Sequence, residues 1–362
     1  MKNIAIVIDS LTGGGAERVM ISLASALIKQ QHSVTLLSLS NKVEYKIPKQ
    51  IKVCNLFKHK ATKVDRFWQF NKSLRKLEAW FANQQDQHGK FDLVLSNLDR
   101  SNNLLAKSSI DSVFFIIHNS INEELHRQKK LGLFAYLYLL QSKKNLSGKN
   151  LVCVSKGIQQ EVFKSKLIKP KSLVTIYNPF DLDDIRQRSQ QTNTDIPSTP
   201  YIIHVGRLAK QKRHDILFQA LSKVTSISTL VLLCNKPQKA LRLAKKHGVE
   251  DRVLVPGFQE NPYNWIKQAE LLILSSDYEG FGNVLLEAIT VNTKVVSTDC
   301  NHGPNEILSG ELSHFLVPRR EPEMLAERIN QAIEANVNLE NAEILSKVNA
   351  ESIAQQYLML VK

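Results

Sequence analysis

Short apolar segments alternate along the chain with longer segments in which apolar residues recur at helical spacing. The short segments are runs of Val, Ile and Leu without polar alternation, which is typical of parallel strands covered by helices on both faces. We expect strands at Ile4–Ile8, Val34–Leu39, Leu93–Ser96, Val113–Ile117, Leu151–Val154, Leu173–Ile176, Tyr201–Val205, Leu230–Leu233, Val253–Val255, Leu271–Leu274, Lys294–Ser297 and His314–Val317. Helices are expected at 16–30, 66–83, 156–164, 211–224, 238–247, 283–291 and 322–335. This alternation predicts an α/β fold with two open sheets.

The chain is expected to divide after residue 178. The connection Tyr177–Pro179 is followed by the polar stretch 186–200, which is typical of a surface connection. We therefore expect two Rossmann-like domains that face each other across a cleft, with residues 1–178 in the first and 179–349 in the second.

Basic residues are concentrated in the first half. The protein has 362 residues, of which 43% are apolar and 23% charged, and its formal net charge is +14. Residues 1–178 carry 28 basic and 12 acidic side chains, a net of +16, whereas residues 179–362 carry 20 and 22, a net of −2. Because apolar strands run through the basic half, the chain is neither a uniformly cationic structural protein nor a disordered tail. The asymmetry indicates an anionic partner for the first domain.

Cysteine usage and hydropathy indicate a cytoplasmic protein. Its four cysteines, at 54, 153, 234 and 300, lie far apart and form no C-x-x-C or zinc-type pattern, so we expect a reducing compartment and no structural metal. The N-terminal apolar stretch is too short for a signal peptide, and no apolar run approaches the about 20 residues needed to span a bilayer.

A glycine run, 13–15, follows the first expected strand and opens a helix. Gly14 and Gly15 allow a close backbone approach, and the amides of a helix N-terminus suit an anion, but the run is equally consistent with a tight turn. Neither a dinucleotide fingerprint nor a P-loop occurs in the chain.

Two cations follow the strand Tyr201–Val205. Arg207 comes directly after Gly206, and Lys212 stands five residues further on. Since ligands bind beyond the carboxyl ends of parallel strands, a guanidinium and an ammonium group there suit a diphosphate. Ordinary surface cations are the alternative interpretation.

A denser constellation follows the strand Leu271–Leu274. Glu279 lies in a glycine-containing loop, a helix begins near Asn283, and Glu287 lies about one turn into it. The amides of residues Gly282 to Val284 then lie at a helix N-terminus, where a phosphate binds well. Carboxylates accept hydrogen bonds from vicinal hydroxyls, so the pair suits a sugar or a ribose; a solvated Glu and a helix-capping Glu are the structural alternative.

Together these motifs resemble glycosyltransferase family 4, whose members are retaining nucleotide-sugar transferases of the GT-B architecture. The resemblance rests on Glu279-x7-Glu287, the Gly206–Lys212 segment, the glycine run, the Tyr177–Pro179 connection and the loop Asp299–Leu308. It extends over nearly the whole chain. It also implies that the last helix, within 350–362, packs back on the first domain.

The resemblance implies a role for each matching residue. Arg207 and Lys212 would neutralise the donor diphosphate, and Glu287 would hold the ribose. Glu279 would contact hydroxyls of the donor sugar, aided by backbone amides of Phe281, Gly282 and Asn283. Gly14 and Gly15 would admit donor phosphates and acceptor, His118 would lie near the transferred sugar, and Val255–Phe258, ending in Phe258, would face the base. Without the resemblance, His118 and this last segment are equally consistent with a structural histidine and a plain turn.

The same resemblance implies a mechanism. The diphosphate leaves through an oxocarbenium-like transition state stabilised by the two cations and the helix N-terminus, and the acceptor attacks the same face, so configuration is retained. Many members need no metal, and no convincing D-x-D motif is present. We therefore expect neither cofactor nor metal.

Two basic segments point to the acceptor. Segment 58–82 interleaves Lys and Arg, including Lys60, Lys63 and Arg66, with Phe and Trp; segment 127–144 places apolar residues between Arg127-Lys129-Lys130 and Lys143-Lys144. Such segments suit an anionic bilayer surface, although both could simply pack on the first sheet. We expect peripheral attachment to the inner face of the cytoplasmic membrane, near a lipid-linked or lipopolysaccharide-type glycan acceptor.

Two other functions remain open. A GT-B enzyme that acts on nucleotide sugars without transfer, such as a 2-epimerase, would share the donor motifs. A nucleic-acid-binding protein would share the charge, but no RNP, KH, zinc-finger or helix-turn-helix pattern accompanies it, so no nucleic-acid partner is expected. The loop Asp299–Leu308 weakly favours a UDP-sugar as donor.

Overall fold

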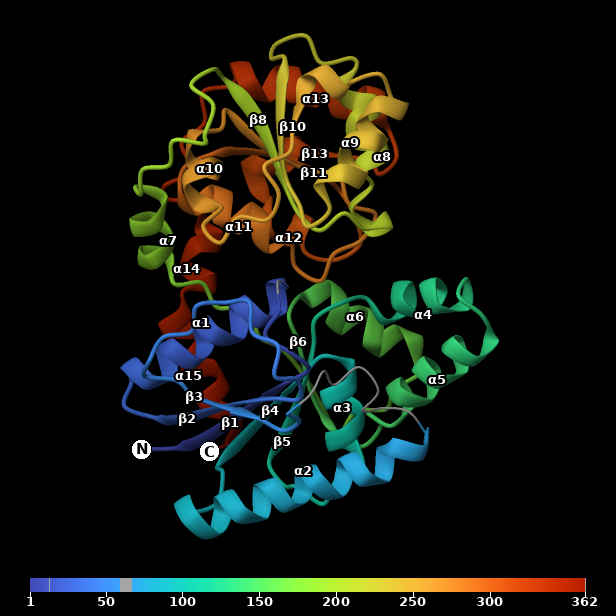
Figure 1. Cartoon of the computed structure of the whole chain (residues 1–362), viewed down its shortest axis with the longest axis vertical. Coiled ribbons are helices and arrows are strands. Elements are labelled where there is room, and N and C mark those ends of the chain that lie inside the picture. Colours follow the sequence, from blue (N-terminus) through green and yellow to red (C-terminus); the bar gives the residue numbers. More distant parts are fainter. Residues whose placement is uncertain (13, 59–66, 362) are drawn as a thin grey trace. The chain divides into compact units, whose positions relative to one another are not determined.

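The computed structural model describes residues 1–12, 14–58 and 67–361, with the side chains of Phe67 and Trp68 left out. These residues form two compact units (Figure 1). Unit 1 comprises Met1–Asp181 together with Lys347–Lys362, and unit 2 comprises Leu182–Ser346. Each unit contains one parallel sheet.

Unit 1 is built on a seven-stranded parallel sheet in the order β3-β2-β1-β4-β5-β6-β7. The strands are β1 Asn3–Ile8, β2 Ser33–Ser38, β3 Lys52–Asn55, β4 Leu93–Asn97, β5 Val113–Ile117, β6 Asn150–Cys153 and β7 Ser172–Thr175. Between β1 and β4 the direction of winding reverses, which opens a crevice at their carboxyl ends. The Val, Ile and Leu residues of β1, β4 and β5 are buried, as strands covered on both faces require.

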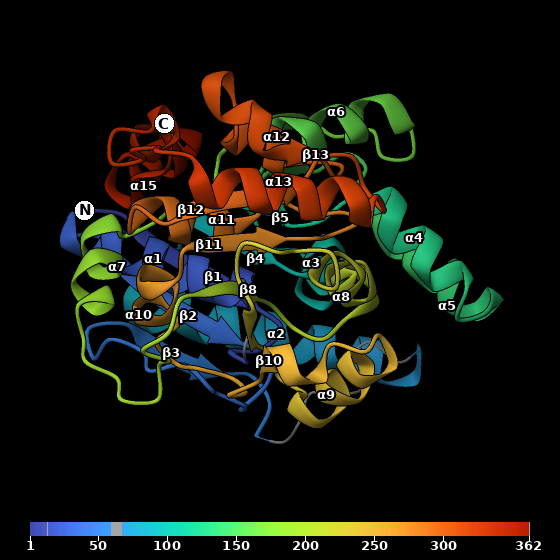
Figure 2. The ribbon, with the colours of Figure 1, turned by 90° about the horizontal axis from the view of Figure 1, so that it is seen from above.

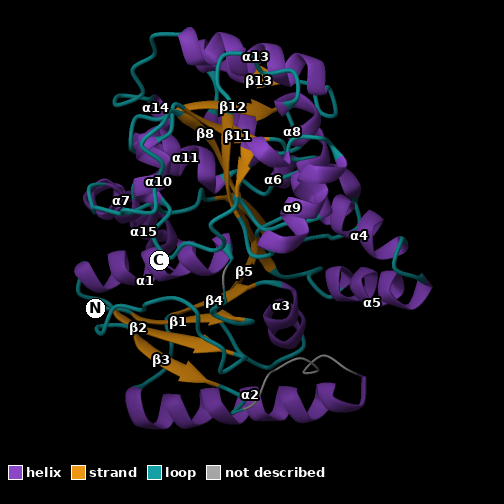
Figure 3. Ribbon diagram, turned by 45° about the horizontal axis from the view of Figure 1, so that its top comes forward, coloured by secondary structure: helices purple, strands orange, loops and turns teal. Residues whose placement is uncertain are grey.

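The helices of unit 1 cover both faces of its parallel sheet (Figure 3). They are α1 Gly15–Lys29, α2 Phe67–His88, α3 Asp99–Ala106, α4 Ile121–Lys129, α5 Leu133–Lys144, α6 Lys156–Ser165 and α15 Ala350–Leu358, followed by the short 3-10 turn η4 Met359–Val361. Right-handed crossovers place α1 on the face opposite α2 and α3. The apolar face of α1, with Val19, Met20, Leu23 and Leu27, is buried.

The last helix, α15, packs beside α1 in unit 1, where the sequence places it. The segment that precedes it pairs with the end of the first domain: Phe180 N–H donates to the Val348 carbonyl at 2.8 Å, and Ala350 N–H donates to the Phe180 carbonyl at 2.9 Å. Asn349 caps the helix by accepting from backbone amides in its first turn. The chain therefore returns to unit 1 through a short parallel bridge and a capped helix.

Unit 2 is built on a six-stranded parallel sheet in the order β10-β9-β8-β11-β12-β13. The strands are β8 Tyr201–Val205, β9 Thr229–Leu233, β10 Val253–Leu254, β11 Leu271–Leu274, β12 Lys294–Thr298 and β13 Leu316–Val317. Here the direction of winding reverses between β8 and β11, whose register pairs Leu271 with Ile202. The loops that follow these two strands therefore emerge side by side.

Helices on both faces of this sheet complete unit 2. They are α7 Leu182–Ser189, α8 His214–Leu221, α9 Pro237–Lys246, α10 Tyr263–Gln268, α11 Asn283–Thr290, α12 Pro304–Ile307, α13 Pro322–Glu334 and α14 Glu343–Val348, whose last two residues fall in unit 1, with 3-10 turns η1 Lys210–Lys212, η2 Glu250–Arg252 and η3 Gly310–Phe315. Helix α13 packs on β12 and α8 (Figure 2). The right-handed connection through α11 places it on the face opposite α8.

Three local expectations were wrong. The stretch 186–200 is a surface connection only from residue 190 on, because its first four residues belong to α7, where Ser189 is buried. Strand β3 was missed because none of its residues is fully buried, so its apolar pattern is weak. Of the expected strand His314–Val317, the first two residues lie in the turn η3, and only the last two form the strand β13.

The basic segment 58–82 is described only in part. Lys60, Lys63 and Arg66 lie outside the described residues. In α2, Trp80 stacks on Phe91 at 6.1 Å, and the buried Phe81 meets both rings edge-on, so these aromatic residues pack within unit 1. This supports the packing alternative for α2.

Candidate active site

The loops after β8 and β11 bring two predicted site residues into contact. Lys212 ends the turn η1 after β8, and its Nζ lies 2.6 Å from Oε1 of Glu279, which follows β11. The same carboxylate oxygen accepts a hydrogen bond from the hydroxyl of Ser276. Both Lys212 and Glu279 are largely buried, so the ion pair is screened less than a surface pair. Ser276 was not singled out in the sequence.

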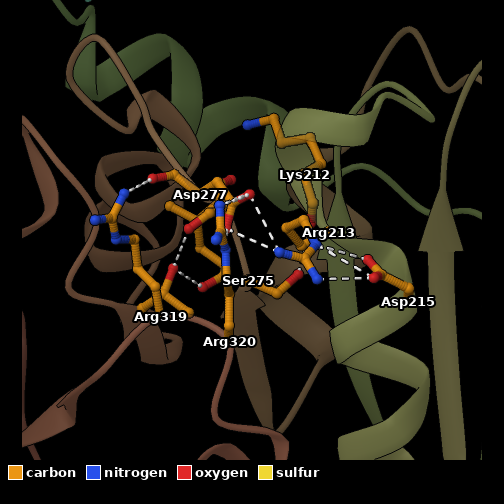
Figure 4. A network of polar contacts seen from close by, with 10 residues as sticks. Lys212, Arg213, Asp215, Ser275, Asp277, Arg319 and Arg320 are labelled. Carbon is orange, nitrogen blue, oxygen red and sulfur yellow. Dashed lines mark hydrogen bonds and ion pairs between the residues drawn. The ribbon is translucent and has the colours of Figure 1, made fainter. Parts of the chain in front are cut away.

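Further hydrogen bonds join the same two loops. Asp277 N–H donates to the Gln211 carbonyl at 2.8 Å, and the Gln211 side-chain amide donates to the Tyr278 carbonyl at 2.7 Å. The hydroxyl of Ser275 donates to the Lys212 carbonyl at 2.8 Å. The Lys212–Glu279 pair is therefore held by contacts between the two loops, in which Lys212 and Ser275 are labelled in Figure 4.

Arg207 lies at the same sheet edge, exposed to solvent. Within the described part of the chain its guanidinium has no hydrogen-bond or ion-pair partner. The next residue is fixed, since Leu208 N–H donates to the Asn235 side chain at 3.1 Å. Arg207 thus stands on an anchored backbone with its five donors available for an anion.

The second half of the constellation starts α11 as expected. Gly282 precedes the helix with φ 95°, a left-handed conformation that favours glycine, and Asn283 is the first helical residue. The side chains of Phe281 and Val284 are buried, so these residues present only backbone groups to a ligand. Glu287 is buried one turn into the helix. The backbone amides in the first turn of a helix point toward its N-terminal end, which makes this start suited to a phosphate.

Phe258 is half exposed and follows Gly257, whose φ of 95° turns the chain sharply after β10. An exposed aromatic ring on such a turn can stack on a planar group. Among the described residues, no hydrogen bond or ring contact joins Phe258 to another predicted site residue.

Two buried histidines lie beneath the β8 loop and were not singled out in the sequence. His204 donates through Nδ1 to the Ile273 carbonyl at 2.9 Å, and its ring meets that of His214 edge-on at 4.8 Å between centroids. The side chains of His204 and Lys212 both flank the Cα of Gly206. Burial, with Lys212 nearby, lowers the pKa of His214 to about 4 and that of His204 well below 6.5. Both rings are therefore neutral beside Lys212 at neutral pH.

In unit 1, His118 follows β5 and contacts the end of β4. Its Nε2 lies 2.9 Å from Oδ1 of Asn97, whose amide group donates to the Val7 and Leu95 carbonyls. Oδ1 of Asn97 therefore accepts a hydrogen bond from Nε2–H of His118, which leaves Nδ1 as an acceptor. Burial lowers the pKa of His118 to about 4, so the ring is neutral at physiological pH. Asn97 was missed, although its place at a strand end beside β5 could have indicated it.

Asp9 lies at the adjacent end of β1 and accepts from Ser101 N–H and Oγ, both at 2.8 Å, and from Arg100 N–H. Burial raises its pKa to about 6 despite these hydrogen bonds. Its carboxylate caps the first turn of α3.

The glycine run is partly explained by packing. Gly13 lies outside the described residues, and Gly15 is the first residue of α1. A side chain on Gly14 would overlap the buried carboxylate of Glu17, while the Gly14 carbonyl accepts from the Tyr45 hydroxyl at 2.8 Å. The protein's own carboxylate therefore lies at this helix N-terminus, where the sequence suggested an external anion.

The described residues contain no group of three or more His, Cys, Asp or Glu side chains arranged to hold a metal ion. None of the helices in the described ranges combines the length and apolar character that a membrane crossing requires.

Sequence families match nearly the whole chain. Residues 13–184 match the family described as Glycosyltransferase Family 4, and residues 186–350 match the family described as Glycosyl transferases group 1.

Two curated relatives are enzymes of glycan assembly. The N-acetylgalactosamine-N,N'-diacetylbacillosaminyl-diphospho-undecaprenol 4-alpha-N-acetylgalactosaminyltransferase of Campylobacter jejuni is 29% identical over 332 residues, covering 88% of this chain and 86% of that protein. The lipopolysaccharide 1,6-galactosyltransferase of Salmonella typhimurium is 28% identical over 173 residues, covering 44% of this chain and 47% of that protein.

Solved structures share the fold. Sucrose-phosphate synthase from Thermosynechococcus elongatus superposes with a TM-score of 0.78 at 18% identity, covering 99% of this chain and 98% of that one. Anabaena HepE in complex with UDP-glucose superposes with a TM-score of 0.75 at 19% identity, covering 99% of each chain. With both family matches, these likenesses show that the chain belongs to glycosyltransferase family 4 and is a glycosyltransferase with the GT-B architecture.

Proposed function

We propose that this glycosyltransferase moves a sugar from a UDP-sugar to a lipid-linked or lipopolysaccharide-type glycan, with retention of anomeric configuration. The observation that carries the proposal is the Lys212–Glu279 pair at the switch point of unit 2, with Arg207 exposed at the same sheet edge. Cations and carboxylates at a switch point suit the phosphates and hydroxyls of one nucleotide sugar.

Lys212 and Arg207 bind the donor diphosphate in this proposal. An ammonium group has three donors, so Lys212 can keep its hydrogen bond to Glu279 while it contacts a phosphate oxygen. The backbone amides that open α11, from Gly282 to Val284, add a helix N-terminus to the same charge. These groups stabilise the leaving diphosphate as the glycosidic bond breaks.

The carboxylates orient the neutral parts of the donor. Glu279 accepts hydrogen bonds from hydroxyls of the sugar, with the backbone of Phe281, Gly282 and Asn283 beside it, and Glu287 accepts from the ribose. The exposed ring of Phe258 stacks on the base. Being held by Lys212 and Ser276, Glu279 is already fixed before a sugar arrives, which lowers the entropy cost of binding.

Unit 1 supplies the acceptor side. Neutral His118, fixed through Nε2 by Asn97, offers Nδ1 to a sugar hydroxyl. Gly14 and Gly15, which carry no side chains, admit the acceptor. The acceptor hydroxyl attacks the face from which the diphosphate departs and passes its proton to a phosphate oxygen, so configuration is retained and no metal is required.

The acceptor lies at a membrane in this proposal. The turn after α4 and the first half of α5 expose five large apolar side chains, with Phe134 89% exposed; they are Leu131, Leu133, Phe134, Leu137 and Tyr138. Arg127, Lys129 and Lys130 are exposed directly before them. We call this surface the α4–α5 face. Apolar residues next to cations suit the cytoplasmic surface of an anionic bilayer, and the named substrate of the Campylobacter relative is an undecaprenol diphosphate.

Lys143 does not share in this surface, contrary to expectation. It is almost fully buried, and its Nζ lies 2.6 Å from Asp99 Oδ1 and 2.7 Å from Glu124 Oε2. Its charge is neutralised inside unit 1, so the cations on the N-terminal side of α5 carry the electrostatic part of the proposal.

A donor screen tests the function. Purified protein is incubated with UDP-glucose, UDP-galactose, UDP-N-acetylglucosamine or UDP-N-acetylgalactosamine and with undecaprenol-diphosphate-linked glycans, and UDP release and product mass are measured. One UDP-sugar should give acceptor-dependent UDP release with an α-linked product. Sugar epimerisation without transfer, or an inverted linkage, would contradict the proposal.

A further inference from the structure

Asp277 forms hydrogen bonds with two other segments of unit 2, so that three segments, including its own, are joined. Its carboxylate accepts from Nη1 of Arg213 at 3.1 and 3.2 Å and from Nε and Nη2 of Arg320 at 3.0 Å each. Its carbonyl accepts from Nη1 of Arg319 at 2.8 Å, and its N–H donates to the Gln211 carbonyl. The donors to the carboxylate, seen in Figure 4, approach from different parts of the chain.

Each of these segments follows a strand at the carboxyl edge of the sheet. Arg213 follows β8, Asp277 itself follows β11, and the arginine pair Arg319–Arg320 follows β13. The loop after β12 joins as well, because Glu279 N–H donates to the Asn301 carbonyl at 3.3 Å. One aspartate thus connects the loops that carry Lys212 and Glu279 to a third loop that carries no proposed donor contact.

The connection between these loops is made by charged groups. Asp277 is mostly buried, whereas Arg320 is largely exposed, and both arginines meet the carboxylate with charge-assisted hydrogen bonds. Arg213 holds a left-handed backbone conformation, φ 47°, directly after Lys212. Its guanidinium donates hydrogen bonds to the carboxylates of both Asp277 and Asp215.

We propose that Asp277 is a positioning residue that, through Arg213 and Arg320, fixes the Lys212–Glu279 pair for sugar transfer. It touches neither donor nor acceptor and acts by holding the loops after β8, β11 and β13 in one arrangement. The proposal rests on the donor-site function proposed above. It adds that the geometry of this site depends on a charge outside it.

The test compares Asp277→Asn with Asp215→Asn as a matched control. Each substitution removes one carboxylate from Arg213 with almost no change in shape. Asp215, however, lies in the same segment as Arg213, and among the described residues its side chain bonds to no second loop. Amide hydrogen exchange is followed in peptides covering 206–213 and 275–280, and kcat and KM are measured with the UDP-sugar selected by the donor screen.

In Asp277→Asn, exchange in both peptides should accelerate about tenfold or more, and kcat should fall about 10–100-fold with donor KM changed by less than about threefold. Asp215→Asn should stay within about threefold of the wild type in both measurements. Exchange and kcat near wild type in Asp277→Asn, or equal losses in both variants, would overturn the proposal.

A second variant guards against misfolding. Arg320→Gln removes an exposed partner of Asp277 and leaves Arg213 in place. It should accelerate amide exchange in the peptide 275–280 several-fold. Unchanged exchange would contradict the proposal that Asp277 holds these loops through Arg320. If wild-type protein transfers no sugar, the donor-site function fails, while the exchange data still decide whether Asp277 holds the loops together.

Discussion

Gly303 packs so closely on Phe281 that a Cβ atom on the glycine would overlap the carbonyl group of the phenylalanine. Gly303 precedes α12 with φ 95°, and Phe281 lies one residue before the glycine that opens α11. The loop after β12 is therefore pressed against the backbone of the proposed donor loop. Glycine is required at position 303 for two reasons: the backbone has a positive φ, and there is no room for a side chain.

Gly303→Ala should destabilise the protein and distort the donor loop. A left-handed alanine costs about 1–2 kcal/mol, and an overpacked contact adds about 1–3 kcal/mol. The matched control is Gly310→Ala, which has φ 60° but no atom within 4 Å of the added Cβ. Urea unfolding should show a clearly larger loss for Gly303→Ala, and equal losses would mean that the Phe281 contact relaxes freely.

Lys143→Met should destabilise unit 1 strongly. The substitution leaves the carboxylates of Asp99 and Glu124 without the cation that lies between them, and breaking a buried ion pair in this way costs about 3–5 kcal/mol. Lys144→Met, at the exposed neighbouring position, should change the unfolding free energy by less than about 0.5 kcal/mol. Similar unfolding curves for the two variants would show that the ion pairs of Lys143 contribute little to the free energy of unfolding.

The sequence predicted the strands better than the contacts. Strands β5, β8 and β11 have the expected bounds because buried parallel strands are continuous apolar runs. Lys212 and Glu279 were each singled out, but their contact depends on β8 and β11 being neighbours, and β9 and β10 intervene in the chain. Local pattern carries no information on such long-range order.

Polar residues that act through other residues were the least predictable. Asp277 lies in a loop and Asn97 is the polar last residue of β4, and the partners of both lie far away in the chain. Lys143 looked like a surface cation because it adjoins Lys144, and only the folding of α5 against α3 and α4 buries it. The charge of a segment predicts its solvent exposure only when no carboxylates approach from elsewhere.

Lys212→Ala should reduce kcat/KM for the donor by about 10²–10³-fold, the size of effect expected when one group that stabilises developing charge is removed. Glu279→Gln should also reduce turnover strongly, because the amide cannot balance the charge of Lys212. Lys210→Ala, exposed in the same turn η1, is the control and should remain within about threefold. Near-native turnover in Lys212→Ala would remove the diphosphate role from this residue.

Protonation of His214 should weaken the fold between pH 6.5 and about 4. In the unfolded chain His214 binds a proton below pH 6.5, whereas in the folded protein burial lowers its pKa to about 4. The contribution of neutral His214 to the free energy of unfolding is therefore complete above pH 6.5. It falls by about 1.4 kcal/mol per pH unit as the pH is lowered from 6.5 toward 4. Asp9 acts in the opposite direction, since its pKa is raised to about 6 and protonation favours the folded state.

The measurement is the pH dependence of the unfolding free energy in His214→Gln and in His314→Gln, an exposed control. His214→Gln should lower the slope between pH 6.5 and 4.5 relative to wild type, whatever its effect at pH 7. An unchanged slope would mean that His214 titrates normally in the folded protein.

The α4–α5 face should bind anionic vesicles through its apolar side chains as well as its charge. Inserting one Phe side chain contributes about 1.5–3 kcal/mol, so Phe134→Ser should lower the partition coefficient about tenfold or more on vesicles of phosphatidylglycerol and phosphatidylethanolamine. Phe163→Ser is the matched control, because Phe163 on α6 is also exposed but is not among the residues that form the α4–α5 face. Purely electrostatic attachment would be abolished by high salt and indifferent to Phe134→Ser, whereas insertion predicts residual binding at high salt that this substitution removes. Equal loss in the two variants, or none in either, would contradict the membrane assignment of the α4–α5 face and leave the donor site of unit 2 unaffected.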